Sequence, residues 1–490
     1  MQGLVNRFAV LAASVLLLAL GACSSDDSDK KDDITPPPPV TTTGTLSVGV
    51  ITGFGSVYVD GVRYDTSSAH VTMDGTASTP AQLRVGQYVE VKGHAQNGDH
   101  HADEIRYHNV LEGPITAIDV AESSFVAMGQ TVLVTSDTSL GDDIQPASIA
   151  GLELGDVVEV SGMVPLSGPI DATRVDIKPD GGPYEVTGYV AGVDTALHTF
   201  DINALAVDYS SANMEDFPTG APADGDLVLV KGRTFAGDGS FVAIEVELRS
   251  DDYLQPGPGD MVEVEGLIEN FVSATDFEVA GMHVTTTAAT TYEHGTAANL
   301  AEGVSVRVKG TTDTTGVLVA NCIAFEVENT VRIVAQVSAV DAGSGSLELL
   351  GLEVKTDEFT RFEDDSVLDL REFDLGDIAV GNWLDVRGYD EPAGSGTIVA
   401  TRVERIDAAE QVRLRGPFQA TMPPNFAIVT VDVTTSDSTV FRIENVEPPG
   451  DRLTRDMFFF LASDETVEAF GDWTGTALAA DRVVIKATDD

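Results

Sequence analysis

The 490-residue sequence contains few cysteines and few basic residues, and both shortages exclude classes of protein. It has only two cysteines, Cys23 and Cys322, so a framework of several disulfides is excluded. It has 28 Lys and Arg residues against 79 Asp and Glu residues, which gives a formal net charge of -51 and a pI of about 4.1. Such a surface repels a polyphosphate, so nucleic acid is excluded as a partner.

Motifs of the common catalytic sites are also missing from the sequence. There is no His-Glu-x-x-His pair, no Walker loop, no EF-hand spacing and no Gly-x-Ser-x-Gly nucleophile turn. The segments Gly343-Ser344-Gly345 and Gly394-Ser395-Gly396 stand among polar residues and are typical of turns. The sequence therefore gives no sign of a conventional active site.

Residues 1–22 have the layout of a secretory signal. Arg7 precedes an almost wholly apolar run from Phe8 to Leu20, which is too short to span a bilayer stably. The segment Leu20-Gly21-Ala22-Cys23 resembles the bacterial lipobox, whose cysteine is lipidated and becomes the first residue of the mature chain. The resemblance implies a lipid anchor at Cys23 and, with Ser24 following, sorting to the outer membrane. The alternative is an ordinary cleaved signal with an incidental cysteine.

Residues 23–43 are predicted to be a disordered tether. Five Asp residues surround Lys30 and Lys31, and four prolines follow from Pro36 to Pro39. Such a segment has no apolar surface to bury, and the proline run favours an extended spacer. We expect it to hold the following domains away from the membrane.

The rest of the chain repeats one phrase six times, an Ala followed by two polar or mixed residues and then Ile or Val. The landmark alanines are Ala102, Ala172, Ala243, Ala320, Ala400 and Ala480. Their steps of 70, 71, 77, 80 and 80 residues indicate a tandem array of one small domain. The expected copies span residues 44–110, 111–180, 183–250, 259–329, 330–407 and 411–488.

Each copy is predicted to contain five strands. An opening strand with a Gly or Ala hinge precedes two short strands around a turn such as Asp60-Gly61, and a variable segment follows. The fourth strand alternates Val with polar residues between glycines seven positions apart, as in Gly155–Gly162, and the fifth carries the landmark Ala. Copy six lacks the leading glycine of this pattern, as an end-capping repeat can.

These features favour an all-β chain built as a tandem array of about six small five-stranded OB-like barrels. The alternative, a chain of open hairpin meanders, would leave long sheet edges exposed. The strings Gly-Asp-x-Val-x-Val-x-Gly and Ala-Thr-Arg-Val resemble a bacterial family of repeated domains of unknown function found in secreted proteins and lipoproteins. The likeness covers nearly all of residues 43–490 and implies the fold and the location, but it transfers no catalytic or binding residue.

Four of the eight histidines lie close together in copy one, where His94 and His101 flank a turn at Asn97-Gly98. A two-residue turn would place His94 across from His101, with Asp103 on the same face of the strand. These three side chains form a candidate zinc or copper site, to which His100 and His108 could add. The alternative is a solvated hairpin that happens to be rich in histidine, because no other copy has the set.

Copy five is rich in acidic residues between Asp357 and Asp377. Val367, Leu370 and Phe373 recur there at helical spacing, which predicts an amphipathic helix with an acidic face in water. Calcium is a weaker alternative, since the ligand loop that encloses such an ion is missing. Cys322 stands where other copies carry Glu or Arg, and we expect a half-exposed, inert thiol.

The function class that fits these features best is a non-catalytic envelope lipoprotein that acts as a spacer or as a multivalent binding array. Expected partners are the membrane, through the lipid, and an envelope protein or a glycan. No cofactor is expected apart from a divalent metal. The rival interpretation is a metal-binding or enzymatic envelope protein that uses residues specific to one copy.

Overall fold

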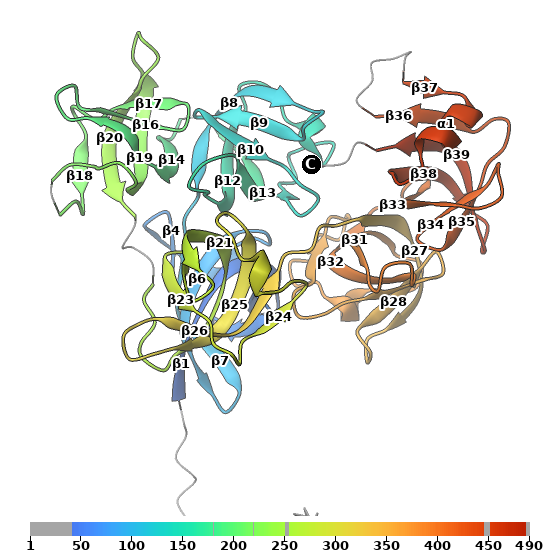
Figure 1. Ribbon diagram of the computed structural model, residues 1–490, viewed down its shortest axis with the longest axis horizontal. Helices are drawn as coiled ribbons and strands as arrows, with labels where there is room; N and C mark the ends of the chain where they lie inside the picture. Colours follow the sequence, from blue (N-terminus) through green and yellow to red (C-terminus); the bar gives the residue numbers. More distant parts are fainter. Residues whose placement is uncertain (1–41, 180, 219, 250–253, 445–450, 487–490) are drawn as a thin grey trace, which may run out of the picture. The chain divides into compact units, whose positions relative to one another are not determined.

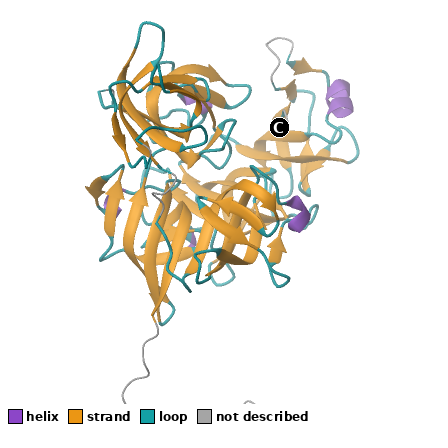
Figure 2. Ribbon diagram, turned by 60° about the vertical axis from the view of Figure 1, so that its left-hand side comes forward, coloured by secondary structure: helices purple, strands orange, loops and turns teal. Residues whose placement is uncertain are grey.

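The computed structural model describes residues 42–179, 181–218, 220–249, 254–444 and 451–486, which Figure 1 colours from blue to red along the chain. The predictions for the signal, Cys23 and nearly all of the tether lie outside these residues. Strands dominate the described chain, and helices are few and short (Figure 2). Among the described residues, no helix is both long and apolar enough to cross a bilayer.

The first three copies contain similar sets of strands. Copy one has β1 (Thr42–Phe54), β2 (Val57–Val59), β3 (Val62–Asp65), β4 (His70–Met73), β5 (Thr76–Ser78), η1 (Pro80–Gln82), β6 (Tyr88–Gln96) and β7 (Asp99–Tyr107). Copy two has β8 (Leu111–Asp119), β9 (Ser124–Ala127), β10 (Gln130–Leu133), β11 (Ser139–Leu140), η2 (Ile149–Gly151), β12 (Val157–Met163) and β13 (Ile170–Lys178). Copy three has β14 (Tyr184–Tyr189), β15 (Ala191–Asp194), β16 (Thr199–Ile202), β17 (Leu205–Asp208), β18 (Asn213–Glu215), β19 (Leu227–Phe235) and β20 (Phe241–Leu248).

The last three copies follow the same order. Copy four has β21 (Met261–Ser273), β22 (Asp276–Val279), β23 (Met282–Thr285), β24 (Thr291–Glu293), η3 (Ala297–Asn299), β25 (Ser305–Thr312) and β26 (Leu318–Phe325). Copy five has β27 (Val331–Asp341), β28 (Ser346–Leu349), β29 (Leu352–Lys355), β30 (Arg361–Asp364), η4 (Leu375–Asp377), β31 (Trp383–Asp390) and β32 (Thr397–Ile406). Copy six has β33 (Val412–Ala420), β34 (Phe426–Ile428), β35 (Val431–Thr434), β36 (Val440–Ile443), β37 (Arg452–Leu453), α1 (Arg455–Leu461), β38 (Thr466–Trp473) and β39 (Leu478–Ile485).

The strands of a copy pair in a closed ring. In copy two, the ring runs β8, β9, β10, β13, β12 and back to β8, and only the β10–β13 pairing is parallel. This five-stranded order is that of an OB-like barrel, as predicted. Copies one, four, five and six close in the same way, whereas copy three divides its opening strand into β14 and β15.

A short additional strand lies in the segment predicted to be variable. In copy two it is β11, which runs parallel to the second half of the last strand, while β10 pairs with the first half. Between β10 and β11, the Thr138 hydroxyl donates a hydrogen bond of 2.7 Å to the carbonyl oxygen of the landmark residue Ala172. The same bond, at 2.7 to 2.8 Å, recurs from Thr290, Thr360 and Thr439.

The landmark alanines and the second glycine of each fourth strand are cross-strand partners. In copy five, Gly388 pairs with Ala400 directly after a β-bulge, and the equivalent Gly–Ala pair follows a bulge in every copy. A Cβ on Gly388 would lie 2.1 Å from the Val399 carbonyl oxygen, and the equivalent distances elsewhere are 1.9 to 2.4 Å. The repeated sequence phrase therefore encodes a tight bend of the barrel wall.

Neighbouring copies share sheets. Strand β8 of copy two pairs with β14 of copy three, β27 of copy five pairs with β33 of copy six, and β1 of copy one pairs in parallel with β21 of copy four. The result is three sheets of 13 strands, each made from two copies. One buried apolar cluster extends from Val110 to Val246 across copies two and three, and another joins copies five and six.

Two expectations are wrong in detail. Strand β1 begins at Thr42, inside the predicted tether, because Thr42 and Thr43 pair with Gln96 and Ala95. The amphipathic helix expected in copy five is also absent from that segment, where only η4 is helical. Asp364 binds the amides of Ser366 and Leu370 and so stabilises a loop instead.

Candidate functional site

The histidines of copy one lie on the predicted hairpin. His94 faces His101 across β6 and β7, and the two rings stack with centroids 5.3 Å apart. His94 Nδ1 is 3.1 Å from Asp103, whereas His101 Nδ1 lies 3.7 Å from Asp65. The register is as expected, but the two rings engage different carboxylates. The metal site remains a prediction.

The other histidines of this segment point elsewhere. His100 packs edge-on against Tyr64 at 5.6 Å, and burial lowers the pKa of its imidazole. His108 lies against Arg249 of copy three, with nitrogen separations of 3.4 and 3.5 Å. Neither therefore joins the pair formed by His94 and His101.

A second group of acidic ligands was not anticipated. Among the described residues, Glu215, Glu245 and Glu247 are the only set of three or more metal-ligand side chains whose ligand atoms lie within 4.8 Å of one another. Glu245 lies 2.9 Å from Lys231, and Glu215 accepts a hydrogen bond from Asn213 at 2.6 Å. These contacts account for the cluster without an ion.

The acidic segment of copy five is likewise used by the protein itself. Although partial burial opposes it, hydrogen bonds from Arg405 and Ser366 lower the pKa of Asp364 to about 2. Asp374 caps η4 by accepting from Gly376 N at 2.6 Å. Asp357 accepts from the amides of Phe359 and Thr360. These carboxylates fix the loop, and nothing in their arrangement encloses a calcium ion. Cys322 on β26 is half-buried.

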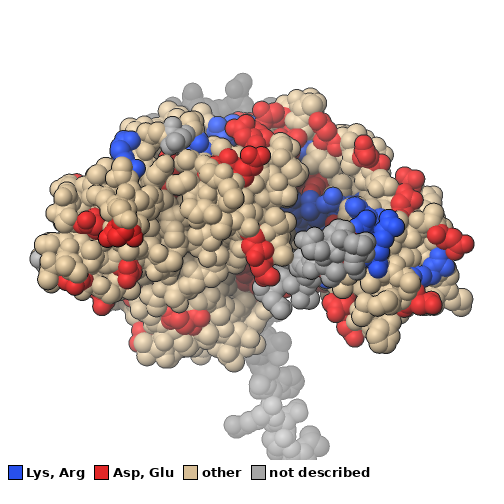
Figure 3. All heavy atoms as spheres, turned by 90° about the horizontal axis from the view of Figure 1, so that it is seen from above, with Lys and Arg blue, Asp and Glu red and all other residues tan. Residues whose placement is uncertain are grey.

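Several of the scarce cations lie at contacts between copies. Acidic side chains are dispersed over the face in Figure 3, whereas Lys and Arg are sparse. Arg361 and Arg402 of copy five donate to the carbonyls of Asp137 and Thr138 in copy two, at 2.5 and 2.9 Å. Arg371 donates to Leu83 in copy one at 2.8 Å. These arginines satisfy backbone acceptors at the points where barrels meet.

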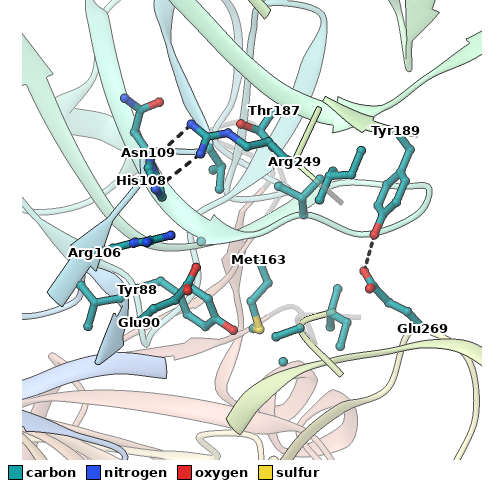
Figure 4. Close-up of a pocket in the computed structure, with 18 residues that line it drawn as sticks. Tyr88, Glu90, Arg106, His108, Asn109, Met163, Thr187, Tyr189, Arg249 and Glu269 are labelled. Atoms are coloured by element: carbon teal, nitrogen blue, oxygen red, sulfur yellow. Dashed lines mark hydrogen bonds between the residues drawn. The ribbon is translucent and has the colours of Figure 1, made fainter. Parts of the chain in front are cut away.

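A cavity of about 120 Å³ lies where copies one to four come together (Figure 4). Its lining includes residues of all four copies, and the ionisable side chains come from copies one, three and four. The polar and aromatic lining residues are Tyr88, Glu90, Arg106, His108, Asn109, Thr187, Tyr189, Arg249 and Glu269. Cavities at the interfaces of domains are common positions of small-molecule sites.

The ionisable groups of this cavity are separated in space. Arg249 and His108 lie together on one side, while Tyr189 and Glu269 lie on the other, with Met163 between them (Figure 4). The Tyr189 hydroxyl donates to Glu269 Oε1 at 2.7 Å. Burial raises the pKa of Glu269, the Tyr189 bond opposes this, and the nearby Glu278 and Glu302 raise it further.

The sequence analysis did not find this cavity, although a signal existed. His108 and Arg249 stand at the same position of their copies, six residues after landmarks Ala102 and Ala243. An alignment of the copies at this position would have shown two side chains, His108 and Arg249, that can bind an anion. The contact between His108 and Arg249 depends on how copies one and three pack together, and the repeat pattern gives no information on that packing.

Comparison with known families agrees with the repeated architecture. Five segments match the family described as Domain of unknown function (DUF5666), at residues 44–106, 112–176, 187–247, 265–324 and 335–404. The chain belongs to the DUF5666 family. No curated protein matched the chain.

The five DUF5666 segments correspond to copies one to five. Copy six, which has the same ring of strands, is not among the matched segments. It differs in carrying α1 before its fourth strand. It also has Asp464, with a φ of 66°, at the position where the other copies have the first glycine of the fourth strand. The sixth barrel thus shares the fold and the landmark alanine of the other copies although the family model does not match its sequence.

Proposed function

We propose that this DUF5666 chain is a lipid-anchored envelope protein whose six barrels act as a non-catalytic scaffold, in the form of a multivalent binding array. The proposal includes no enzymatic activity. Its main support is that the residues repeated from copy to copy are structural. The Gly–Ala bulge and the threonine hydroxyl bond shape the barrels, and no acid, base or nucleophile recurs with them.

The contacts between copies favour an array over a simple spacer. A spacer requires only length, so its domains can be independent. Here copies two and three share a buried cluster, and copies two and five are joined through Arg361 and Arg402. Coupled domains hold side chains of different copies in a fixed relation, which gives composite sites such as the cavity lined by copies one to four.

The anchor and the outer-membrane location rest on the sequence alone, through Cys23 and the signal before it. The expected partners are the membrane and an envelope protein or glycan. The strong negative charge keeps nucleic acid away.

The anchor is tested by labelling cells with a fatty-acid analogue and fractionating them. Wild type should carry the label and sediment with the outer membrane, whereas Cys23→Ser should lose both. Cys322→Ser is the matched control and should behave as wild type. Equal label and membrane recovery in the Cys23 variant would contradict the proposal.

A further inference from the structure

Two glutamates face each other at the joint between copies two and three, where β8 pairs with β14. The register of this pairing places Leu111 opposite Val186 and Glu112 opposite Glu185. Two like charges directly opposite each other on antiparallel strands destabilise the pairing. The joint is therefore most stable when at least one of the two carboxyl groups is protonated.

A third carboxyl group reaches this joint from copy one. Asp74 follows β4, and its carboxylate accepts a hydrogen bond of 2.8 Å from the backbone amide of Asn109. The Asn109 side chain is only 4% exposed, and its Nδ2 donates to Glu185 at 3.5 Å. Asn109 thus binds carboxyl groups of copies one and three at the same buried position.

The lysines that act on these carboxyl groups are each held by another acid. Lys178 on β13 lies 2.7 Å from Glu159 on β12, and Lys231 on β19 lies 2.9 Å from Glu245 on β20. Further charged groups around the joint are Asp176, Glu247, Arg249 and His108. Of these, Arg249 lies 3.6 Å from Glu247. The joint therefore holds more carboxyl groups than cations.

Burial shifts the three carboxyl groups in the same direction. It raises the pKa of Glu185 to about 7, although Lys231 opposes the rise. It raises the pKa of Asp74 to about 6, although the Asn109 amide opposes the rise. It also raises the pKa of Glu112, and nearby Glu159 adds to that rise. Bound protons therefore stabilise the closed joint, and this stabilisation is lost as the pH rises through about 6 to 7.

The equivalent joint between copies five and six has no facing pair of carboxyl groups. Val334 pairs there with Arg413, and Ile333 pairs with Leu414. Counted from the hinge of the opening strand, Val334 and Arg413 occupy the positions of Glu112 and Glu185 in their copies. Valine does not titrate and arginine keeps its charge at neutral pH, so this joint is an internal control.

We propose that the joint between copies two and three is a proton-controlled hinge, which is closed when Glu112, Glu185 and Asp74 hold protons and opens when they lose them. Opening frees β14 from β8 while both barrels stay folded. This inference goes beyond the scaffold role, because an array whose joints ignore pH would keep that role. Either can therefore fail without the other.

The test is hydrogen exchange measured by mass spectrometry on the chain from Ser24 to Asp490, at pH 5 and pH 8. The Thr187 amide donates to the Val110 carbonyl at 2.8 Å across the joint, so peptides that span β14 report its opening. After division by the intrinsic exchange rate, exchange in β14 should rise at least about tenfold from pH 5 to pH 8. Exchange in β33, at the joint of copies five and six, should stay nearly constant. No rise in β14, or an equal rise in β33, would overturn the proposal.

Strand β16 distinguishes opening of the hinge from unfolding of copy three. It pairs with β15 and β17 of its own copy, so its exchange should not follow that of β14. An equal rise in β16 would mean that the whole copy unfolds, and would also overturn the proposal.

Variants assign the effect to the carboxyl groups. Glu185→Gln should reduce the rise in β14 at least about threefold, because it removes one of the three titrating groups. Glu122→Gln, at an exposed position of copy two, should leave the rise unchanged. Circular dichroism at pH 5 shows whether each variant folds, and Glu112→Gln replaces Glu185→Gln if the latter does not. An unchanged rise in the folded variant would reject the hinge.

Discussion

Replacing Gly388 by Ala probes the bulge that defines the repeat. The new Cβ would lie 2.1 Å from the Val399 carbonyl oxygen and 3.0 Å from the Ala400 Cα. Both contacts involve backbone atoms, so the wall of the barrel itself must move. Overpacking of this kind destabilises a fold by about 1–3 kcal/mol. Gly→Ala also lowers the conformational entropy of the unfolded chain, which stabilises the fold by only about 0.4–1 kcal/mol. We expect a net destabilisation.

The assay is urea unfolding followed by tryptophan fluorescence. The chain has two tryptophans, Trp383 on β31 of copy five and Trp473 on β38 of copy six. The signal therefore reports the pair of copies that contains Gly388. Gly343→Ala in copy five is the control, since Gly343 is exposed and a Cβ there meets only a side-chain oxygen of Asp341, at 3.2 Å. A Gly388 variant as stable as wild type would refute the interpretation of the landmark as a steric bend.

Two further predictions concern titratable groups. Glu112 faces Glu185 where β8 pairs with β14, and burial raises the pKa of Glu185 from 4.5 to about 7. The contribution of Glu185 to stability should therefore be full below about pH 4.5 and be lost as the pH rises through about 7. Glu185→Gln should flatten this dependence in thermal melts, and an unchanged slope would count against it. Zinc should bind wild type more tightly than His94→Ala/His101→Ala in titration calorimetry at neutral pH, because the variant lacks two ring-nitrogen ligands. Equal heats from the two proteins would mean that the segment is a polar hairpin without a metal site.

The repeat and the barrel could be predicted because both are local properties of each copy. Alternation of Val with polar residues defines the fourth strand, and the spacing of landmark alanines defines the period. The acidic segment of copy five misled the prediction, because Phe373 is buried while Val367 is exposed on a loop that Asp364 organises. The amides of Ser366 and Leu370 donate to the Asp364 carboxylate, and these hydrogen bonds favour a loop over the helix that the apolar spacing predicted.

The candidate cavity could not be predicted from one copy. Arg249 and Glu269 come from different barrels, and each looks like an ordinary surface charge within its own sequence. Their relation depends on pairing between copies, such as the parallel pairing of β1 with β21. Copy one thus pairs with copy four rather than with its sequence neighbour. The spacing of the repeats does not indicate which copies pair with each other.

Hydrogen exchange measured by mass spectrometry tests whether the barrels are coupled. Arg361 of copy five donates to the Asp137 carbonyl of copy two at 2.5 Å. Arg361→Met should therefore speed exchange in residues 135–141 of copy two, whereas Lys355→Met, whose ion pair with Glu353 stays within β29, should not. Unchanged exchange in residues 135–141 of the Arg361 variant would mean that this contact does not couple copy five to copy two, and would contradict the coupled scaffold.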